Sequence, residues 1–269
     1  MLYLRSFIFN IVCYSTLTVG CIFNSLVGLV SPKATIKIWN YTFIPFLVWS
    51  LKHLAGIEIE IRGRQYMMQE DCIYAGKHES ALETYVLSNY IKRASFVLKK
   101  ELTYIPIFGW AQYFYGMIPV DRSAGSAAMK NMLRSAKDRL QDDRPLIIFP
   151  EGTRRKPGQE PCYKPGVALL YQNLNVPVIP IAVNTGFFWK KSSFMRYPGK
   201  VIFEFMEPLP AGMDKKTFMS ELQKRIEGKC AELNAETIKN YPYTAPMLDQ
   251  SKDLSLIHIS EPTRLALIS

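Results

Sequence analysis

The sequence has few histidines and no cysteine pair of the kind that binds zinc. Three histidines occur in 269 residues. The five cysteines are odd in number and never form a Cys-x-x-Cys motif, which argues against a disulfide framework or a zinc site. They are Cys13, Cys21, Cys72, Cys162 and Cys230. We therefore expect a reducing, cytosolic environment and neither a metal centre nor another resident cofactor.

Several functional motifs are also missing. The chain has no Gly-x-Ser-x-Gly elbow, which makes a serine hydrolase of the α/β-hydrolase type a poor interpretation. It has no helix-turn-helix, zinc-finger or RNA-recognition pattern. The net charge of +10 (33 Lys and Arg against 23 Asp and Glu) favours a polyanionic partner, either nucleic acid or an anionic lipid surface. Nucleic acid would explain the charge but not the apolar N-terminus described next, so we expect a membrane partner and no nucleic acid.

The N-terminal region contains an uncharged run of 24 residues, Phe7 to Val30. At about 1.5 Å per residue, a helix of this length crosses a hydrocarbon layer of about 30 Å. Polar side chains dilute the run, so a helix that dips into the membrane interface without crossing is an equal alternative. A cleaved signal peptide is disfavoured because Ser31 to Lys33 lacks a small-x-small cleavage pattern.

A second apolar stretch, Tyr41 to Leu51, lies among tryptophans and lysines, a mixture typical of a lipid headgroup boundary. An ordinary buried helix is the alternative interpretation. We expect residues 1–55 to form a membrane-associated helical segment.

From Gly56 onward the pattern predicts an α/β domain. Ile57 to Arg62 alternates apolar and polar residues, as a half-buried strand does, whereas Leu146–Phe149 and Val176–Val183 are apolar runs typical of strands covered on both faces. Helical faces alternate with them: Met129, Met132, Leu133, Ala136 and Leu140, then Phe218, Leu222 and Ile226 after an Asp214 cap.

This order predicts a largely parallel mixed sheet flanked by helices over residues 56–245. Residues 246–269 are expected to lie outside the fold. Within them, residues 254–269 resemble a translated sequencing adapter, so His258 is excluded from functional reasoning.

With His258 set aside, two histidines can accept a proton near neutral pH. His53 lies in the aromatic N-terminal region and is interpreted as structural. His78 lies at a predicted strand-to-helix junction, where Ser80 can cap the following helix. Glu83 is five residues further on; within one continuous helix the two side chains would point about 140° apart. If His78 instead precedes the helix, Glu83 can fold back onto the imidazole as a catalytic partner. Alternatively, Ser80 and Glu83 form a capping box.

Two further segments have features of phosphate sites. Gly116 to Arg122 ends a predicted strand with an arginine, and Phe149 to Arg154 directly follows a buried strand. The ends of strands are where α/β sheets place ligands, and arginine binds phosphate oxygens bidentately. Gly152 would let the backbone approach a ligand closely.

Together these segments resemble the glycerolipid acyltransferase family, specifically the bacterial 1-acyl-sn-glycerol-3-phosphate acyltransferases. The resemblance covers residues 1–245 and rests on four blocks in the family order. They are His78–Glu83 (His-x-x-x-x-Asp in most members), Gly116–Arg122, Phe149–Arg154 (Phe-Pro-Glu-Gly-Thr-Arg) and the proline-containing Val176–Asn184. The departure is Glu83, which stands where most members have aspartate.

The resemblance implies an α/β acyltransferase without a covalent acyl-enzyme. His78 and Glu83 would be the catalytic pair, and the substrate-binding residues would be Lys99, Arg122, Glu151, Gly152, Thr153 and Arg154. The expected reaction moves a fatty acyl group from acyl-CoA or acyl carrier protein to the sn-2 hydroxyl of 1-acyl-sn-glycerol 3-phosphate (lysophosphatidic acid), giving phosphatidic acid. The expected location is the cytoplasmic face of a bacterial inner membrane. Two alternatives stay open, a glycerol-3-phosphate or other lysophospholipid acyltransferase and a non-catalytic lipid-binding module.

Overall fold

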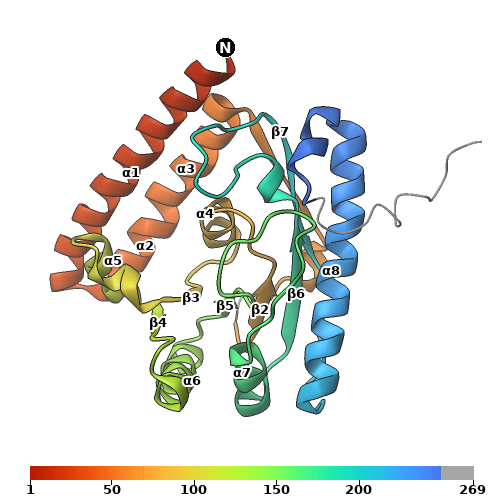
Figure 1. Ribbon diagram of the computed structural model, residues 1–269. Helices are drawn as coiled ribbons and strands as arrows, with labels where there is room; N and C mark the ends of the chain where they lie inside the picture. The colour runs from red at the N-terminus through yellow and green to blue at the C-terminus, as the bar shows by residue number, and fades with distance from the viewer. Residues whose placement is uncertain (69, 250–269) are drawn as a thin grey trace, which may run out of the picture.

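A mixed seven-stranded sheet forms the centre of the protein (Figure 1). The structure is a computed structural model that describes residues 1–68 and 70–249, so most of the expected tail lies outside the described residues. Residues 246–249 of that tail instead belong to the fold, because Met247 and Leu248 pack against buried apolar residues and the Asp249 N–H donates to the Pro157 carbonyl. The strands are β1 (Ile57–Arg62), β2 (Ile73–Gly76), β3 (Ser95–Lys99), β4 (Ile118–Val120), β5 (Leu146–Ile148), β6 (Val178–Val183) and β7 (Gly199–Phe205). Their order is β1-β7-β6-β2-β5-β3-β4, and every pair is parallel except β6 with β7. The predicted largely parallel α/β sheet is confirmed.

Helices cover both faces of the sheet. They are α1 (Leu2–Val30), α2 (Pro32–Ile38), α3 (Ile44–Ser50), α4 (Leu82–Tyr90), α5 (Phe108–Tyr115), α6 (Gly125–Gln141), α7 (Gly166–Leu174) and α8 (Lys215–Asn240). One core lies between the sheet and α1, α3 and α4, and a second core lies between the sheet and α6, α7 and α8. The predicted apolar faces of α6 and α8 lie in the second core, and the Asp214 carboxylate caps α8 by accepting from the backbone N–H groups of Lys216 and Thr217.

The central strands contribute side chains to both cores. Tyr74 of β2 packs in the first core, whereas its neighbours Ile73 and Ala75 pack in the second. Because successive strand side chains point to opposite faces, an apolar residue is needed at every position of a strand covered on both sides. This explains the unbroken apolar runs of β5 and β6.

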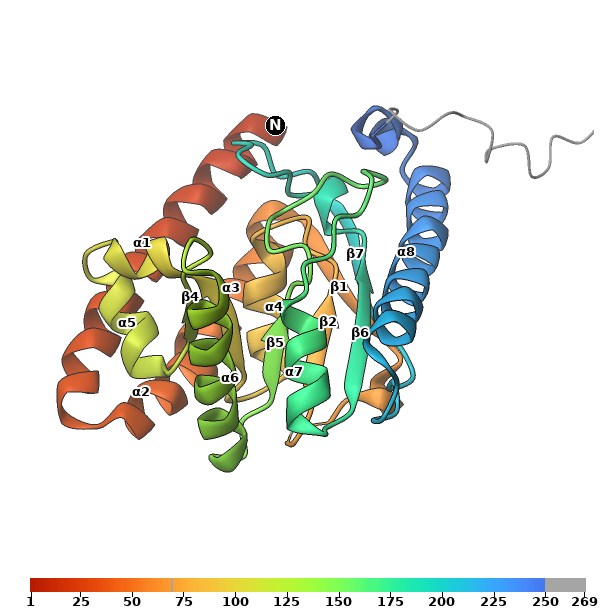
Figure 2. The same ribbon diagram turned by 60° about the horizontal axis from the view of Figure 1, so that its bottom comes forward.

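Parallel pairing brings the carboxyl ends of β2, β3, β4, β5 and β6 to one edge of the sheet (Figure 2). Lys99 is the last residue of β3, and the segments that follow the other strands contain His78, Arg122, the Phe149–Arg154 block and Thr185. Topology therefore gathers residues that are up to about a hundred positions apart in the sequence.

The N-terminal region is an antiparallel pair of helices beside the α/β domain (Figure 1). α1 runs in one direction, and the chain returns through a continuous helix, Pro32 to Ala55, with π-type turns at Trp39–Phe43 and Leu51–Ala55. Glycines allow close packing here, since a Cβ added at Gly28 would come within 2.3 Å of Phe114 on α5.

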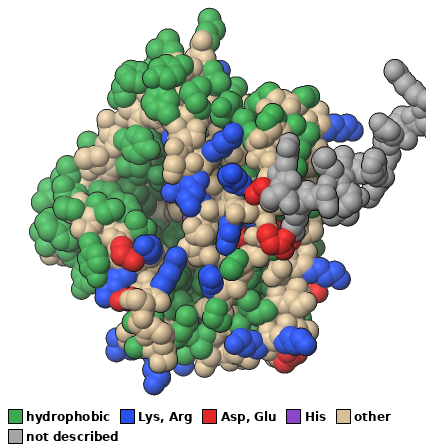
Figure 3. All heavy atoms as spheres, viewed as in Figure 1, with side chains coloured by type: hydrophobic (Ala, Val, Ile, Leu, Met, Phe, Trp, Pro, Cys, Tyr) green, Lys and Arg blue, Asp and Glu red, His purple; other side chains and the backbone are tan. Residues whose placement is uncertain are grey.

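In α1 the polarity of the two faces is the reverse of that in an ordinary helix packed on a protein core. The side packed against the protein carries small and polar residues such as Ser6, Asn10, Asn24 and Ser25. Large apolar side chains point outward: Tyr3, Leu4, Phe7, Ile8, Ile11, Tyr14, Val19, Ile22, Phe23, Leu26, Leu29 and Val30. Figure 3 shows this apolar surface continuing over the neighbouring helices. By length and composition, α1 is the candidate membrane span among the described residues, although a core helix or a signal sequence can satisfy the same criterion.

The second apolar stretch has two different faces. Ile44, Leu47 and Leu51 are buried in the first core, while Tyr41, Phe46 and Trp49 are exposed. One face therefore packs as a buried helix does, and the other presents aromatic rings to the surroundings; contact of that second face with lipid headgroups stays a prediction.

Candidate active site

His78 and Glu83 lie together at the carboxyl edge of the sheet. β2 ends at Gly76 and α4 begins at Leu82, so the imidazole stands in the connecting turn, outside the helix. His78 Nδ1 is 3.1 Å from Glu83 Oε2. The structure confirms the folded-back geometry expected from the sequence, and the longer side chain of glutamate reaches the imidazole.

Glu83 is held by several donors besides His78. Its carboxylate is fully buried and accepts from the backbone N–H of Ser80 (2.9 Å) and of Glu79 (3.2 Å). The Thr185 hydroxyl, which follows β6, also donates to it. The carboxylate therefore caps the turn before α4 and orients His78 at the same time, so the two interpretations of Glu83 are compatible.

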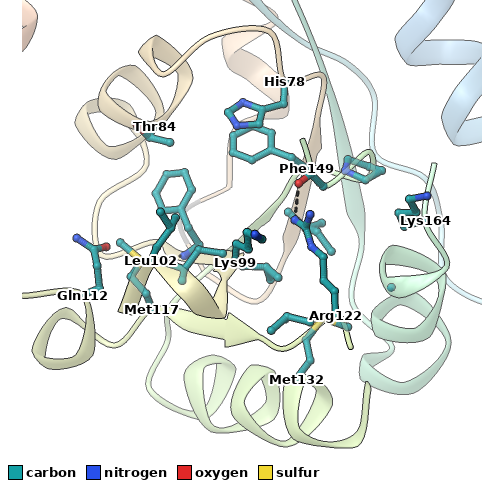
Figure 4. A pocket seen from close by; sticks show the side chains of 18 of the residues that line it. His78, Thr84, Lys99, Leu102, Gln112, Met117, Arg122, Met132, Phe149 and Lys164 are labelled. Carbon is teal, nitrogen blue, oxygen red and sulfur yellow. Dashed lines mark hydrogen bonds between the residues drawn. The ribbon is translucent and has the colours of Figure 1, made fainter. Parts of the chain in front are cut away.

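The His78 ring stacks on Phe149 and faces a cavity of about 740 Å³ (Figure 4). The ring centroids are 4.0 Å apart and the planes differ by 12°. Most of the cavity wall is apolar and comes from helices and strands far apart in sequence: Leu17, Trp39, Ile44, Phe96, Leu98, Leu102, Phe108, Met117, Met129, Met132 and Val167. A polar reacting group thus stands at the wall of a cavity suited to a hydrocarbon chain.

Three cationic side chains line the same cavity, those of Lys99, Arg122 and Lys164. Arg122 donates to the carbonyl oxygen of Gly152, as Figure 4 shows. Gly152 has φ of +66°, and an added Cβ would come within 3.0 Å of an Arg122 nitrogen. Glycine is needed there both for the left-handed backbone and for the approach of the guanidinium.

The sequence predicted one of the two lysines of the cavity as a binding residue and missed the other. Lys99, a predicted residue, forms an exposed ion pair with Glu101 at 3.0 Å. Lys164 was not predicted. The sequence signal for a binding role of Lys164 was weak, since it consists only of a lysine before Pro165 at the start of α7.

Glu151 is placed differently from the expected substrate contact. Its side chain is 1% exposed and pairs with the buried ammonium of Lys77 at 3.1 Å. Lys77 also pairs with Glu227 of α8 at 2.9 Å, and the Tyr163 hydroxyl donates to Glu227. Burial alone would lower the pKa of Lys77, but the two carboxylates raise it, so the ammonium stays charged. This network, which sequence reasoning missed, joins the residue before His78 to the Phe149–Arg154 block.

The remaining predicted residues point elsewhere. Thr153 is exposed, and Arg154 lines a second cavity of about 630 Å³ rather than the one containing Arg122. Arg122 and Arg154, both expected to bind substrate, therefore line different cavities. A binding role for Thr153 and Arg154 stays a prediction.

Within residues 1–68 and 70–249, no three His, Cys, Asp or Glu side chains are grouped so that they could hold a metal ion. The chemistry available at the site is proton transfer by an imidazole, assisted by a carboxylate and by cations on the cavity wall.

A histidine paired with a carboxylate next to an apolar cavity is an arrangement suited to a transferase or a hydrolase, and comparisons with known proteins narrow this class. Residues 58–184 match the family model described as Acyltransferase. A 1-acyl-sn-glycerol-3-phosphate acyltransferase of Pseudomonas aeruginosa is 35% identical over 191 residues, covering 71% of this chain and 74% of that protein. One from Helicobacter pylori is 29% identical over 56% of this chain and 64% of its own length.

A solved structure has the same fold. The crystal structure of the 1-acyl-sn-glycerophosphate acyltransferase PlsC from Thermotoga maritima matches with a TM-score of 0.69 at 19% identity, covering 87% of this chain and all of that one. The chain belongs to the acyltransferase family and is an acyltransferase.

Proposed function

We propose that this enzyme transfers a fatty acyl group from acyl-CoA or acyl carrier protein to the sn-2 hydroxyl of 1-acyl-sn-glycerol 3-phosphate, producing phosphatidic acid for phospholipid synthesis. The observation that carries the proposal is the His78–Glu83 pair at the wall of an apolar cavity that also contains Arg122, Lys99 and Lys164. The printed names of the relatives support the same acceptor.

The proposed chemistry has one direct transfer step. His78 Nδ1–H donates to Glu83, so the free Nε2 accepts the proton of the acceptor hydroxyl as its oxygen attacks the thioester carbonyl. The carbon–sulfur bond then breaks, and the imidazolium gives the proton to the departing sulfur, so the thiol leaves and the neutral base is restored. Glu83 fixes the tautomer and stabilises the imidazolium, a role that its buried, fully bonded carboxylate suits. We assign charge stabilisation of the oxyanion to backbone amides or a cation of the cavity wall.

In this proposal, the cations and the apolar wall of the cavity bind different parts of the substrate. Arg122, supported by the Gly152 carbonyl, binds the acceptor phosphate together with Lys99 and Lys164, while the apolar wall takes an acyl chain. No resident cofactor is needed for this chemistry, since the acyl group arrives already activated as a thioester.

We further propose that the outward apolar face of α1 and the aromatic residues Tyr41, Phe46 and Trp49 hold the enzyme at the cytoplasmic face of a bacterial inner membrane. The small, polar inner side of α1 packs on the protein, so its apolar side is left for lipid. The lysophosphatidic acid acceptor would then lie in the same membrane surface as the cavity.

One assay tests the proposed reaction. Purified protein is incubated with labelled acyl-CoA or acyl carrier protein and with lysophosphatidic acid, glycerol 3-phosphate and other lysophospholipids in parallel, and the product lipids are identified. We expect labelled phosphatidic acid from lysophosphatidic acid. If labelled lysophosphatidic acid formed from glycerol 3-phosphate instead, the acceptor would be glycerol 3-phosphate. If no labelled lipid formed with any acceptor, the proposed reaction would be refuted.

A further inference from the structure

A second cavity, of about 630 Å³, lies next to the active site and is lined by a cluster of cations. Its basic residues are Arg154, Arg155, Lys156, Lys190 and Lys191. Arg154 to Lys156 come from the segment after β5 and the two lysines from the segment after β6. Figure 3 shows basic side chains gathered over this part of the molecule. Among the described residues, Arg154, Lys156, Lys190 and Lys191 form no ion pair with a carboxylate, so their charge is available to a ligand.

The wall of this cavity also contains a buried carboxyl with one unbonded oxygen. Glu79 is 1% exposed; its Oε2 accepts from the Gly186 N–H at 2.9 Å, whereas its Oε1 has no hydrogen-bond partner among the described residues. Burial raises the pKa of this carboxyl to about 8, so at neutral pH it is mostly protonated and does not oppose an anion. The other acidic residue of the wall is Asp249. The cavity therefore combines a strong positive charge with an uncharged polar group.

The second cavity is fixed to the catalytic pair. The consecutive residues Thr185 and Gly186 bond to Glu83 and Glu79, respectively, and the lysines follow them after the buried Phe187, Phe188 and Trp189. A Cβ added at Gly186 would lie 2.8 Å from Pro157, so the two segments that supply the cations touch at this glycine. His78 lines the first cavity and Glu79 the second. A ligand in the second cavity thus lies against the residue next to the base.

We propose that this second cavity binds the phosphate end of the donor's phosphopantetheine arm, with Lys156, Lys190 and Lys191 on the phosphate and Glu79 on an arm amide. The inference rests on the proposed function, because it requires a thioester donor. An acyl thioester of this type joins a long amide-containing arm to a phosphate, which matches the neutral polar group and the cations. The arm occurs in both acyl-CoA and acyl carrier protein, so the cavity recognises chemistry that the two donors share.

The test compares donors that differ in the phosphate. Initial rates are measured for the full-length enzyme with palmitoyl-CoA, palmitoyl-carrier protein and palmitoyl-pantetheine, which lacks the phosphate, at a fixed ionic strength. The test variant is Lys190→Glu/Lys191→Glu. The control is Lys215→Glu/Lys216→Glu, which makes the same change of charge at the start of α8, where neither lysine lines either cavity.

We expect the test variant to lose roughly 10- to 100-fold in kcat/KM with at least one phosphorylated donor, as expected when charge-assisted phosphate contacts are reversed. The rate with palmitoyl-pantetheine and the KM for lysophosphatidic acid should change less than about two-fold. A loss with both phosphorylated donors supports the shared arm phosphate, whereas a loss with palmitoyl-CoA alone, with the carrier-protein donor used as well as by wild type, would overturn it. Lys156→Glu, on the other segment, should show the same selectivity.

Three further results would overturn the inference. They are equal losses of kcat/KM with all three donors, a rise confined to the KM for lysophosphatidic acid, and an unchanged kcat/KM in both the double variant and Lys156→Glu. A wild-type enzyme that transfers the acyl group to no acceptor would instead refute the proposed function, so the two failures are distinguishable.

Discussion

Lys77 provides the sharpest prediction about how the site is held together. Its ammonium is 3.1 Å from Glu151 and 2.9 Å from Glu227, and the side chains of Lys77 and Glu151 are each 1% exposed. Replacing Lys77 with methionine leaves the buried Glu151 carboxylate with only a more distant cation, the Arg155 guanidinium at 3.9 Å. Breaking a buried ion pair from one side costs about 3–5 kcal/mol. At about 2–4 °C per kcal/mol for a protein of this size, Tm should fall by roughly 6–20 °C.

The measurement is thermal unfolding in detergent at one scan rate, for wild type, Lys77→Met and the double variant Lys77→Met/Glu151→Gln. The double variant should recover a large part of the lost Tm, because it removes the unpaired charge. The defect of Lys77→Met should shrink at lower pH, where Glu151 takes up a proton. Lys99→Met, which breaks the exposed pair with Glu101, is the control and should change Tm by less than about 2 °C.

A Lys77→Met protein that melts within about 2 °C of wild type would refute this reasoning about the buried network. The same variants also decide what Glu151 does. If Glu151 contacted the acceptor directly, Glu151→Gln alone would raise the KM for the acceptor while leaving Tm unchanged.

Three further outcomes follow from the structure. Because burial raises the pKa of Glu79 from 4.5 to about 8, the native protein keeps a proton that the unfolded chain releases, so stability falls as pH rises through this window. The Tm of Glu79→Gln should therefore be higher than that of wild type at pH 8 and close to it at pH 5. A Tm difference that does not depend on pH would contradict this. Arg122→Ala should raise the KM for lysophosphatidic acid roughly 10- to 100-fold and that for the donor far less, since charge-assisted bonds to phosphate contribute about 1.5–3 kcal/mol; an effect on the donor alone would move Arg122 to the donor site. Ile11→Glu/Leu26→Glu should shift the enzyme from the membrane to the soluble fraction, whereas Ile11→Leu/Leu26→Ile should not, and a charged variant that stays fully bound would exclude this face of α1 as the anchor.

The charged variants of α1 are a better test of membrane attachment than a truncation. Removing residues 1–52 would also remove Phe9, Ile44, Leu47 and Leu51, which are buried against the α/β domain. Such a truncated protein would expose part of the first core, so its solubility would report on folding as well as on the anchor.

Local patterns in the sequence predicted the strands in which apolar residues follow a regular pattern, either alternating with polar ones or filling the whole strand. The alternation of Ile57 to Arg62 gave β1, and the apolar runs gave β5 and β6, because a strand buried on both faces needs apolar residues throughout. β3 and β7 were missed. β7 pairs antiparallel with β6, a choice that no residue of β7 encodes locally.

The site was predictable where one motif contains both partners, as with His78 and Glu83. Its supports were not, because Thr185 lies 102 residues from Glu83, and Glu227 lies 150 residues from Lys77. Those contacts are set by the order of strands in the sheet and by the docking of α8. The placement of Glu151 and Arg154 shows the same limit, since a motif fixes which residues follow a strand but not which side of the segment each one faces.

The central claim is that His78 is the base of an acyl transfer, and the direct test is the turnover of His78→Ala with labelled acyl donor and lysophosphatidic acid. His53, the other histidine within the described residues, is exposed and packs on Trp49, so His53→Ala is the matched control. We predict that His78→Ala loses about 100-fold or more in kcat while remaining folded, and that His53→Ala keeps near-normal activity. A folded His78→Ala enzyme with near-normal turnover would contradict the mechanism.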